Sequence, residues 1–166
     1  MNIVVQLEER AGTAPGVAYQ WDPDTDILSA RIQPSPASDG DAGSVEIQGA
    51  DGSWVILDVA DGQLGGLEVA VWPEVNKNSA LKPPAVRDAL VRFPSGGSAS
   101  AVTAVEVETP IAAESDPAEH IFHFRFGVPQ PTTAVRVATE LLLEVDGKNR
   151  VVGLWLLNVP PFPDEP

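Results

Sequence analysis

Two segments of the chain resemble each other, and this internal repeat constrains the fold more than any other feature of the sequence. Residues 54–73 match residues 140–160, with one extra residue at the turn of the second segment. In this alignment Gly66 falls on Gly153, and each glycine is followed by a proline seven residues later. The match predicts that a structural unit occurs twice in the chain.

A second pair of segments lies upstream and keeps the same order. Residues 27–32 match residues 121–126, which aligns Arg31 with Arg125. Chance resemblance between two β-hairpins of similar composition is the alternative explanation. The shared order of the matched blocks, and their similar separations, favour two diverged copies of one unit.

Apolar and polar residues alternate over much of both copies, as is typical of half-buried β-strands. The alternation from Val135 to Val145 predicts one long strand in the second copy. In the first copy, the sequence Gly-Ala-Asp-Gly-Ser at residues 49–53 predicts a turn between two shorter strands, at 45–48 and 54–59.

Two Asp-Gly pairs, Asp61-Gly62 and Asp146-Gly147, predict hairpin turns with positive φ. They lead into strands predicted at 64–72 and 151–159. We therefore expect a mainly β protein made of two pseudo-repeated antiparallel β-meanders, packed as one sandwich- or barrel-like body.

The segment from Pro84 to Phe93 has helical spacing. Val86, Ala89, Leu90 and Phe93 fall at i, i+3, i+4 and i+7, and prolines flank the segment on both sides. This pattern predicts a short amphipathic helix between the copies. The predicted organisation is residues 1–82 for the first β repeat, 83–97 for the helix and a linker, 98–160 for the second β repeat, and 161–166 for an extended tail.

The chain is strongly acidic, with 24 Asp and Glu residues against 10 Lys and Arg, a formal net charge of −14 and no cysteine. Such a charge disfavours binding to nucleic acid or to an anionic membrane. The missing cysteines exclude disulfides, thiolate metal sites and thiol nucleophiles. The sequence also shows neither a signal-peptide pattern nor an apolar run long enough to span a membrane. We expect a cytoplasmic protein whose partner is another protein or a second copy of itself.

Three carboxylates at alternate positions, Asp22, Asp24 and Asp26, form the strongest candidate cluster. They could converge on a hard cation such as Ca²⁺ or Mg²⁺, although the glycine and glutamate that an EF-hand loop requires are missing. The alternative is an Asp-Pro turn whose aspartates cap their own backbone before the strand that follows. No cofactor is otherwise expected.

His120 and His123 invite a metal site, but three residues of separation in a strand place two side chains on opposite faces. One histidine is expected at the strand end and the other exposed. For the tryptophans, strand parity places Trp72 on the face opposite Leu67, Val69 and Val71, and places Trp155 on the face opposite Leu154 and Leu156. The sequence leaves open whether these tryptophans are covered by the other copy or form an interaction surface.

The first copy resembles a small bacterial domain family of unknown function. The family pattern, Tyr-Asp-x-x-x-Asp-x-Leu followed by Gly-x-hydrophobic-Val-Gly-Ile-Glu, corresponds here to Trp21-Asp22, Asp26-Ile27-Leu28 and Gly62 to Glu68. The resemblance covers roughly residues 19–72 and implies a small β-rich bacterial domain without implying a reaction. If the family's Asp and Glu form a site, Glu68 belongs to it, and the second copy has lost it because Trp155 stands at that position.

These observations favour a bacterial accessory or protein-interaction protein without catalytic activity. The alternative is a small-ligand or divalent-cation binding protein that uses Asp22, Asp24, Asp26 and Glu68. An acid–base hydrolase with two close carboxylates ranks third, and no catalytic residue is assigned.

Overall fold

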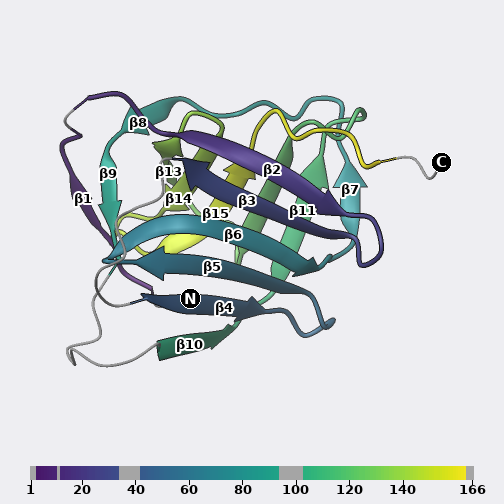
Figure 1. The fold of residues 1–166 in the computed structure, drawn as a ribbon, viewed down its shortest axis with the longest axis horizontal. Helices are drawn as coiled ribbons and strands as arrows, with labels where there is room; N and C mark the ends of the chain where they lie inside the picture. The colour runs from purple at the N-terminus through teal and green to yellow at the C-terminus, as the bar shows by residue number, and fades with distance from the viewer. Residues whose placement is uncertain (1–2, 11, 34–41, 94–102, 164–166) are drawn as a thin grey trace.

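The computed structural model describes residues 3–10, 12–33, 42–93 and 103–163, and within these ranges every regular element is a β-strand (Figure 1). The expectation of a mainly β protein is therefore confirmed. The strands form three sheets, of two, six and seven strands, and none of these closes into a barrel. Within the described part of the chain, no helix is long and apolar enough to cross a membrane.

The six-stranded sheet has the order β10-β4-β5-β6-β3-β2. Its strands are β2 (Gly16–Asp22), β3 (Ile27–Gln33), β4 (Ala42–Gln48), β5 (Trp54–Ala60), β6 (Gln63–Val71) and β10 (Thr103–Glu108). All neighbours pair antiparallel except β10, which adds to β4 in parallel. The predicted turn at 49–53 is confirmed, since the Gly49 N–H donates to the Ser53 carbonyl at 2.9 Å.

The seven-stranded sheet has the order β7-β11-β12-β15-β14-β13-β8. Its strands are β7 (Val75–Lys77), β8 (Val86–Asp88), β11 (Ile111–Ser115), β12 (Phe122–Phe126), β13 (Thr133–Ala138), β14 (Leu141–Val145) and β15 (Val151–Leu156). Five consecutive strands of each sheet follow one spatial order: β4-β5-β6-β3-β2 in the first and β13-β14-β15-β12-β11 in the second.

The two large sheets pack face to face and share one hydrophobic core (Figure 1). Leu28, Leu57 and Leu67 enter it from the six-stranded sheet, and Phe122 and Phe124 enter it from the seven-stranded sheet, all of them at most 2% exposed. Alternate residues of β3, β5 and β12 are buried in this way because one face of each sheet is turned inward. The architecture is thus a β-sandwich with one interior.

Two strands cross the predicted boundaries between the copies. β10, assigned to the second copy by sequence, extends the six-stranded sheet, while β7, assigned to the first, pairs with β11 in the other sheet. Each large sheet therefore contains chain from both sides of the predicted linker. The part of that linker from residue 94 to residue 97, and the tail beyond residue 163, lie outside the described residues.

The predicted helix at 84–93 is wrong. The segment forms β8 and then β9 (Leu90–Arg92), which pair with β13 and with β1 (Gln6–Glu8). Ala89, Val91 and Phe93 are at most 5% exposed, which is the period-two pattern of a strand. A helix of fewer than three turns is marginal without tertiary support, and here the neighbouring strands supply the backbone partners instead.

The predicted long strand from Val135 to Val145 is also wrong, because it folds back on itself as the β13–β14 hairpin. Ala138 pairs with Leu141, and Thr139 and Glu140 form the turn. Two hydrogen bonds join this turn to β2 and the residue before it. The Thr139 N–H donates to the Pro15 carbonyl at 2.8 Å, and the Tyr19 hydroxyl donates to the Glu140 carbonyl at 2.6 Å. A hairpin therefore lies at the matched place of each of the two predicted copies, β4–β5 in one and β13–β14 in the other.

The two predicted Asp-Gly turns have different outcomes. Asp61 and Gly62 have φ values of 51° and 76°, as expected for a tight hairpin between β5 and β6. In the β14–β15 hairpin the positive φ of 58° falls on Asn149 instead of Gly147. Asp146 organises that longer loop, since its carboxylate accepts from the Lys148 and Arg150 N–H groups at 2.9 Å.

Candidate functional site

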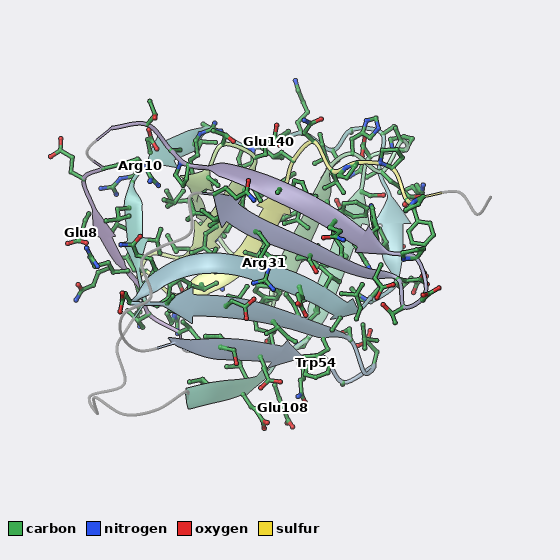
Figure 2. The ribbon with its side chains drawn as sticks, in the orientation of Figure 1. Glu8, Arg10, Arg31, Trp54, Glu108 and Glu140 are labelled. Carbon is green, nitrogen blue, oxygen red and sulfur yellow. The ribbon has the colours of Figure 1, made fainter. Side chains whose placement is uncertain are left out.

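The solvent-facing side of the six-stranded sheet carries most of its charge (Figure 2). Buried Val45, Ile47, Leu57 and Leu67 point inward, so the residues that alternate with them point outward. We call this outward surface the acidic face, and its carboxylates are those of Glu46, Asp58, Glu68, Glu106 and Glu108. Arg31 is the only lysine or arginine in the six strands.

Arg31 lies between two of these carboxylates. Its Nη1 is 3.2 Å from Oδ2 of Asp58, and its Nη2 is 3.6 Å from Oε1 of Glu68. The pKa of Asp58 lies above its ordinary value. Partial burial raises this pKa most, the Arg31 charge lowers it, and the nearby Glu68 charge raises it. Glu68, predicted as a ligand-site residue, is thus the partner of an exposed arginine.

The predicted cation ligands Asp22, Asp24 and Asp26 lie together in the turn between β2 and β3. The Asp24 N–H donates to Oδ1 of Asp22 at 3.0 Å, and the Asp26 N–H donates to the Asp22 carbonyl at 2.8 Å. No group of three or more His, Asp or Glu side chains in the described ranges is close enough to share a metal ion. The structure does not join Glu68 to the aspartates, and a cation site in this turn stays a prediction.

The lower edge of the acidic face in Figure 2 holds a tryptophan that strand parity did not single out. Trp54 is half-buried on the outer side of β5, and its cross-strand neighbour Gln48 lies beside Glu108. Its Nε1 is buried and has no hydrogen-bond partner within the described part of the chain. An aromatic ring therefore lies in the same cross-strand row as Glu108, with Gln48 between them.

The seven-stranded sheet has a different arrangement on its own outer face. Arg125 and Glu144 both pair with Gly153, one from each neighbouring strand, and His123 lies two residues before Arg125. Nε2 of His123 is 2.5 Å from Oε1 of Glu144, and the Thr132 hydroxyl donates to Oε2 of Glu144 at 3.0 Å. The His123 ring stacks on the Trp155 indole with 4.1 Å between centroids.

Glycine at position 153 makes room for this cluster. A Cβ built there would lie 2.7 Å from the Phe124 carbonyl oxygen and would collide with Oε1 of Glu144. At Gly66, which the sequence alignment matches to Gly153, a Cβ would lie 2.5 Å from the Ala30 carbonyl oxygen. Both glycines permit a close approach that no side chain allows.

Glu144 is only 6% exposed, so burial on its own would raise its pKa. The hydrogen bond and charge of His123 and the hydrogen bond from Thr132 outweigh burial, and the pKa of Glu144 falls below its ordinary value. The Trp155 indole also lowers this pKa, although its Nε1–H does not reach hydrogen-bonding geometry with any acceptor among the described residues. Glu144 is therefore a buried carboxylate whose charged form is favoured by its hydrogen-bond partners.

A pocket of about 170 Å³ opens beside this cluster. Its polar lining comes from His123, Arg125, Gln130, Thr132 and Glu144. Its apolar lining comes from Val128, Pro129 and Val152. The segment between β12 and β13 supplies one wall and strands β12, β14 and β15 supply the other, so the pocket lies between a connection and the outer face of the sheet.

The histidine predictions are corrected in one respect. His120 is exposed just before β12, as expected for a strand end, but the side chain of His123 is only 18% exposed. The burial of His123 could not be predicted from local sequence, because its partner Glu144 is 21 residues away and belongs to a different strand. The match of residues 54–73 with 140–160 also places Asp58 on Glu144, and that correspondence is a signal that could have pointed to this position.

The tryptophans predicted as an interaction surface are both turned toward other side chains. Trp155 is 5% exposed and lies opposite Leu154 and Leu156, as parity predicts. Trp72 departs from parity: a bulge at Ala70 shifts the register, so Trp72 stacks on Trp21 at 5.5 Å and contacts Phe122. Val71, at 46% exposure, takes the outward position instead.

Comparison with known proteins adds no assignment to this geometry. No protein-family model matches the chain, and no curated protein matches it. The resemblance of the first copy to a small bacterial domain family stays a prediction.

Proposed function

We propose that the protein is an accessory protein without catalytic activity that binds a basic, extended segment of another protein. The binding surface is the acidic face together with the outer edge of β10. The observation that carries this proposal is the uneven charge of the two sheets. The six-stranded sheet holds six acidic residues and one basic residue in its strands, whereas the seven-stranded sheet holds three acidic and four basic residues.

Among the described residues, no Lys or Arg forms an ion pair with the carboxylates near the β10 edge, Glu46, Glu106 and Glu108. Glu106 of β10 is paired in register with Glu46 of β4, and like charges in adjacent strands repel each other. Arg31, the one cation of these strands, is engaged by Asp58 and Glu68. Lysine or arginine side chains from a partner would relieve this repulsion and would also pack against the ring of Trp54.

The edge of β10 offers backbone partners to an added strand. The Thr109 N–H donates to the Gln48 carbonyl at 3.0 Å, and the N–H groups of Val105 and Val107 point toward β4 by the same alternation. Glu106 and Glu108 therefore direct their N–H and C=O groups away from β4, where no strand pairs within the described ranges. Such an edge can recruit an extended peptide by strand addition.

Quantitative affinity capture at physiological salt tests the proposal. The triple variant Glu46→Gln, Glu106→Gln, Glu108→Gln is compared with wild type and with a matched variant, Glu9→Gln, Glu74→Gln, Glu119→Gln, which loses the same charge elsewhere. The proposal expects a partner protein that is retained by wild type and by the matched variant and lost by the triple variant. It also expects that this partner presents a basic segment.

A backbone variant separates strand addition from charge. Glu106→Pro removes an outward N–H, which edge strands tolerate, whereas Val107→Pro removes an N–H that faces β4 and should destabilise the sheet. Partner capture should fall in Glu106→Pro while its thermal unfolding stays close to that of Glu106→Gln. Equal capture by wild type, the triple variant and Glu106→Pro would contradict the proposal.

We also infer that the two sheets arose by duplication of one five-stranded unit. Three features support this. Five strands of each sheet follow the same order, and a bulge directly follows Asp58 in one sheet and Glu144 in the other. In each sheet an arginine and a carboxylate also lie on either side of a glycine, as the cross-strand rows Arg31–Gly66–Asp58 and Arg125–Gly153–Glu144. Related chains that carry a single unit and assemble as dimers would support the inference, whereas relatives that share only one of the rows would weaken it.

A further inference from the structure

The two aligned rows of residues use their arginines differently. In the six-stranded sheet, Arg31 reaches across Gly66 to the carboxylate of Asp58. In the seven-stranded sheet, Arg125 stands in the same place relative to Gly153 and Glu144, but Glu144 is taken by His123 and Thr132. The residue that would neutralise the arginine is therefore already engaged.

Arg125 consequently has no carboxylate partner within the described part of the chain. No hydrogen bond or ion pair joins its guanidinium to another described residue, and its Nε is buried without a hydrogen-bond acceptor. A buried donor without a partner destabilises a fold, because it has lost its hydrogen bonds to water without replacing them. Arg125 lines the pocket, so an acceptor placed there could pair with its guanidinium.

The pocket next to Arg125 limits the size and character of such an acceptor. Its volume of about 170 Å³ is close to that of cavities of about 150 Å³ that hold one benzene molecule. Val128, Pro129 and Val152 provide apolar walls for a short alkyl chain. A guanidinium binds a carboxylate through two parallel hydrogen bonds, which a single charged oxygen cannot accept.

We propose that this pocket binds a small monocarboxylate of about six non-hydrogen atoms, whose carboxylate pairs with Arg125 and whose alkyl chain lies against Val152. This site is independent of the acidic face, since it lies on the other sheet. Glu144 and Thr132 hold His123 against Trp155 and so keep the pocket wall in place. His123 and Glu144 are positioning residues in this arrangement.

Titration of the ¹⁵N-labelled full chain with butyrate at constant ionic strength tests the site by NMR. Butyramide has the same size and shape without the charge, and butylamine carries the opposite charge. We expect saturable shifts for the backbone amides of Arg125, Gln130 and Thr132 with butyrate, and at least tenfold weaker binding of butyramide and butylamine.

Substitution of each aligned arginine provides the matched control. Arg125→Gln should weaken butyrate binding at least tenfold, whereas Arg31→Gln, on the other sheet, should leave it unchanged. Arg125→Lys keeps the charge but loses the planar guanidinium, so it should also bind butyrate more weakly than wild type. This second variant tests the site in case Arg125→Gln fails to fold. The proposal is overturned if butyramide binds as tightly as butyrate, if either Arg125 variant binds like wild type, or if no saturable shift occurs.

Discussion

Nε2 of His123 lies 2.5 Å from Oε1 of Glu144, whereas at the aligned position of the other sheet the carboxylate of Asp58 pairs with Arg31. In the six-stranded sheet, Asp58 is 3.2 Å from Arg31, and both side chains are more than a third exposed. In the seven-stranded sheet the carboxylate is almost completely buried. The same strand order therefore carries a solvent-screened ion pair on one sheet and a buried carboxylate beside a pocket on the other.

The buried pair predicts a specific acid dependence of stability. The pKa of Glu144 is lowered in the folded protein, so its contribution is present above the ordinary glutamate pKa of about 4.3 and is lost as the pH falls through the folded pKa. Glu144→Gln should be about 1.5–3 kcal/mol less stable than wild type at pH 7, with a smaller difference at pH 3. Urea unfolding between these pH values measures both. Glu108→Gln, at an exposed position, is the control, and stability curves that stay parallel would refute the assignment.

Steric crowding at the aligned glycines gives a second prediction. Gly153→Ala should destabilise the protein by about 1–3 kcal/mol, because the new Cβ approaches the Phe124 carbonyl and the Glu144 carboxylate. Gly66→Ala should have a similar effect, since its Cβ would lie 2.5 Å from the Ala30 carbonyl. Gly147→Ala meets nothing within 4 Å and should be close to neutral. Chemical denaturation of the three variants tests the ranking, and a neutral Gly153→Ala would contradict it.

The sequence predicted the strands and several turns because those signals are local. Alternation placed β5, β6 and β15, and the Gly-rich turn at 49–53 separated β4 from β5 as expected. Alternation failed where both faces of a strand are buried. β13 and β14 have almost continuous burial, because Leu81, Val86 and Leu157 cover the outer face, so nothing in the pattern marked the turn at Thr139.

The candidate sites depended on contacts that local patterns do not encode. The crossover strand order brings Arg125 and Glu144 to either side of Gly153, and no spacing rule predicts that juxtaposition. The bulge at Ala70 likewise reversed the facing of Trp72, which parity assigned to the outside. By contrast, the aspartates at 22–26 lie in a turn that their own sequence specifies, and here the short-range pattern was sufficient.

A divalent cation at that turn has a direct test. If Asp22, Asp24 and Asp26 bind Ca²⁺ or Mg²⁺, millimolar metal should raise the thermal midpoint, and EDTA should lower it, because a ligand that binds only the native state stabilises it. Asp24→Asn should abolish the metal-dependent shift without abolishing folding. A thermal midpoint that is unaffected by either metal would rule out this site.

The acidic face should reduce the stability of the sheet that carries it. Glu106 and Glu46 are in-register neighbours, so Glu106→Gln should stabilise the protein by about 0.2–1 kcal/mol, with a larger gain at low salt. Glu9→Gln, which lies outside the large sheets, is the matched control. Salt-dependent thermal unfolding measures both variants. Equal gains in the two would mean that net charge, and not the Glu46–Glu106 pairing, causes the effect.

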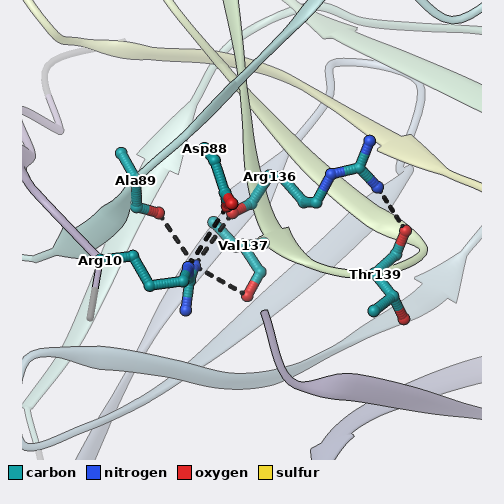
Figure 3. A network of polar contacts seen from close by, with 6 residues as sticks. All are labelled: Arg10, Asp88, Ala89, Arg136, Val137 and Thr139. Atoms are coloured by element: carbon teal, nitrogen blue, oxygen red, sulfur yellow. Dashed lines mark hydrogen bonds and ion pairs between the residues drawn. The ribbon is translucent and has the colours of Figure 1, made fainter. Parts of the chain in front are cut away.

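Arg10 ties the N-terminal segment to two other parts of the chain, residues 88–89 and strand β13 (Figure 3). Its Nη2 donates to the carbonyls of Ala89 and Arg136 at 2.9 and 3.0 Å, and its Nε lies 3.4 Å from the Asp88 carboxylate. Arg10→Met keeps much of the side-chain volume but leaves these carbonyls without the donor, so the free energy of unfolding should fall by about 1–3 kcal/mol.

Arg92→Met provides the comparison for Arg10, because Arg92 forms an exposed ion pair with Glu8 between β9 and β1. Surface pairs of this kind contribute about 0–1 kcal/mol, so Arg92→Met should cost clearly less than Arg10→Met. Hydrogen exchange should also rise at β1 and β9 in Arg10→Met, since the segment that follows β1 loses its attachment to β13. Equal losses of stability in the two variants would show that the Arg10 contacts stabilise the fold no more than a surface ion pair does.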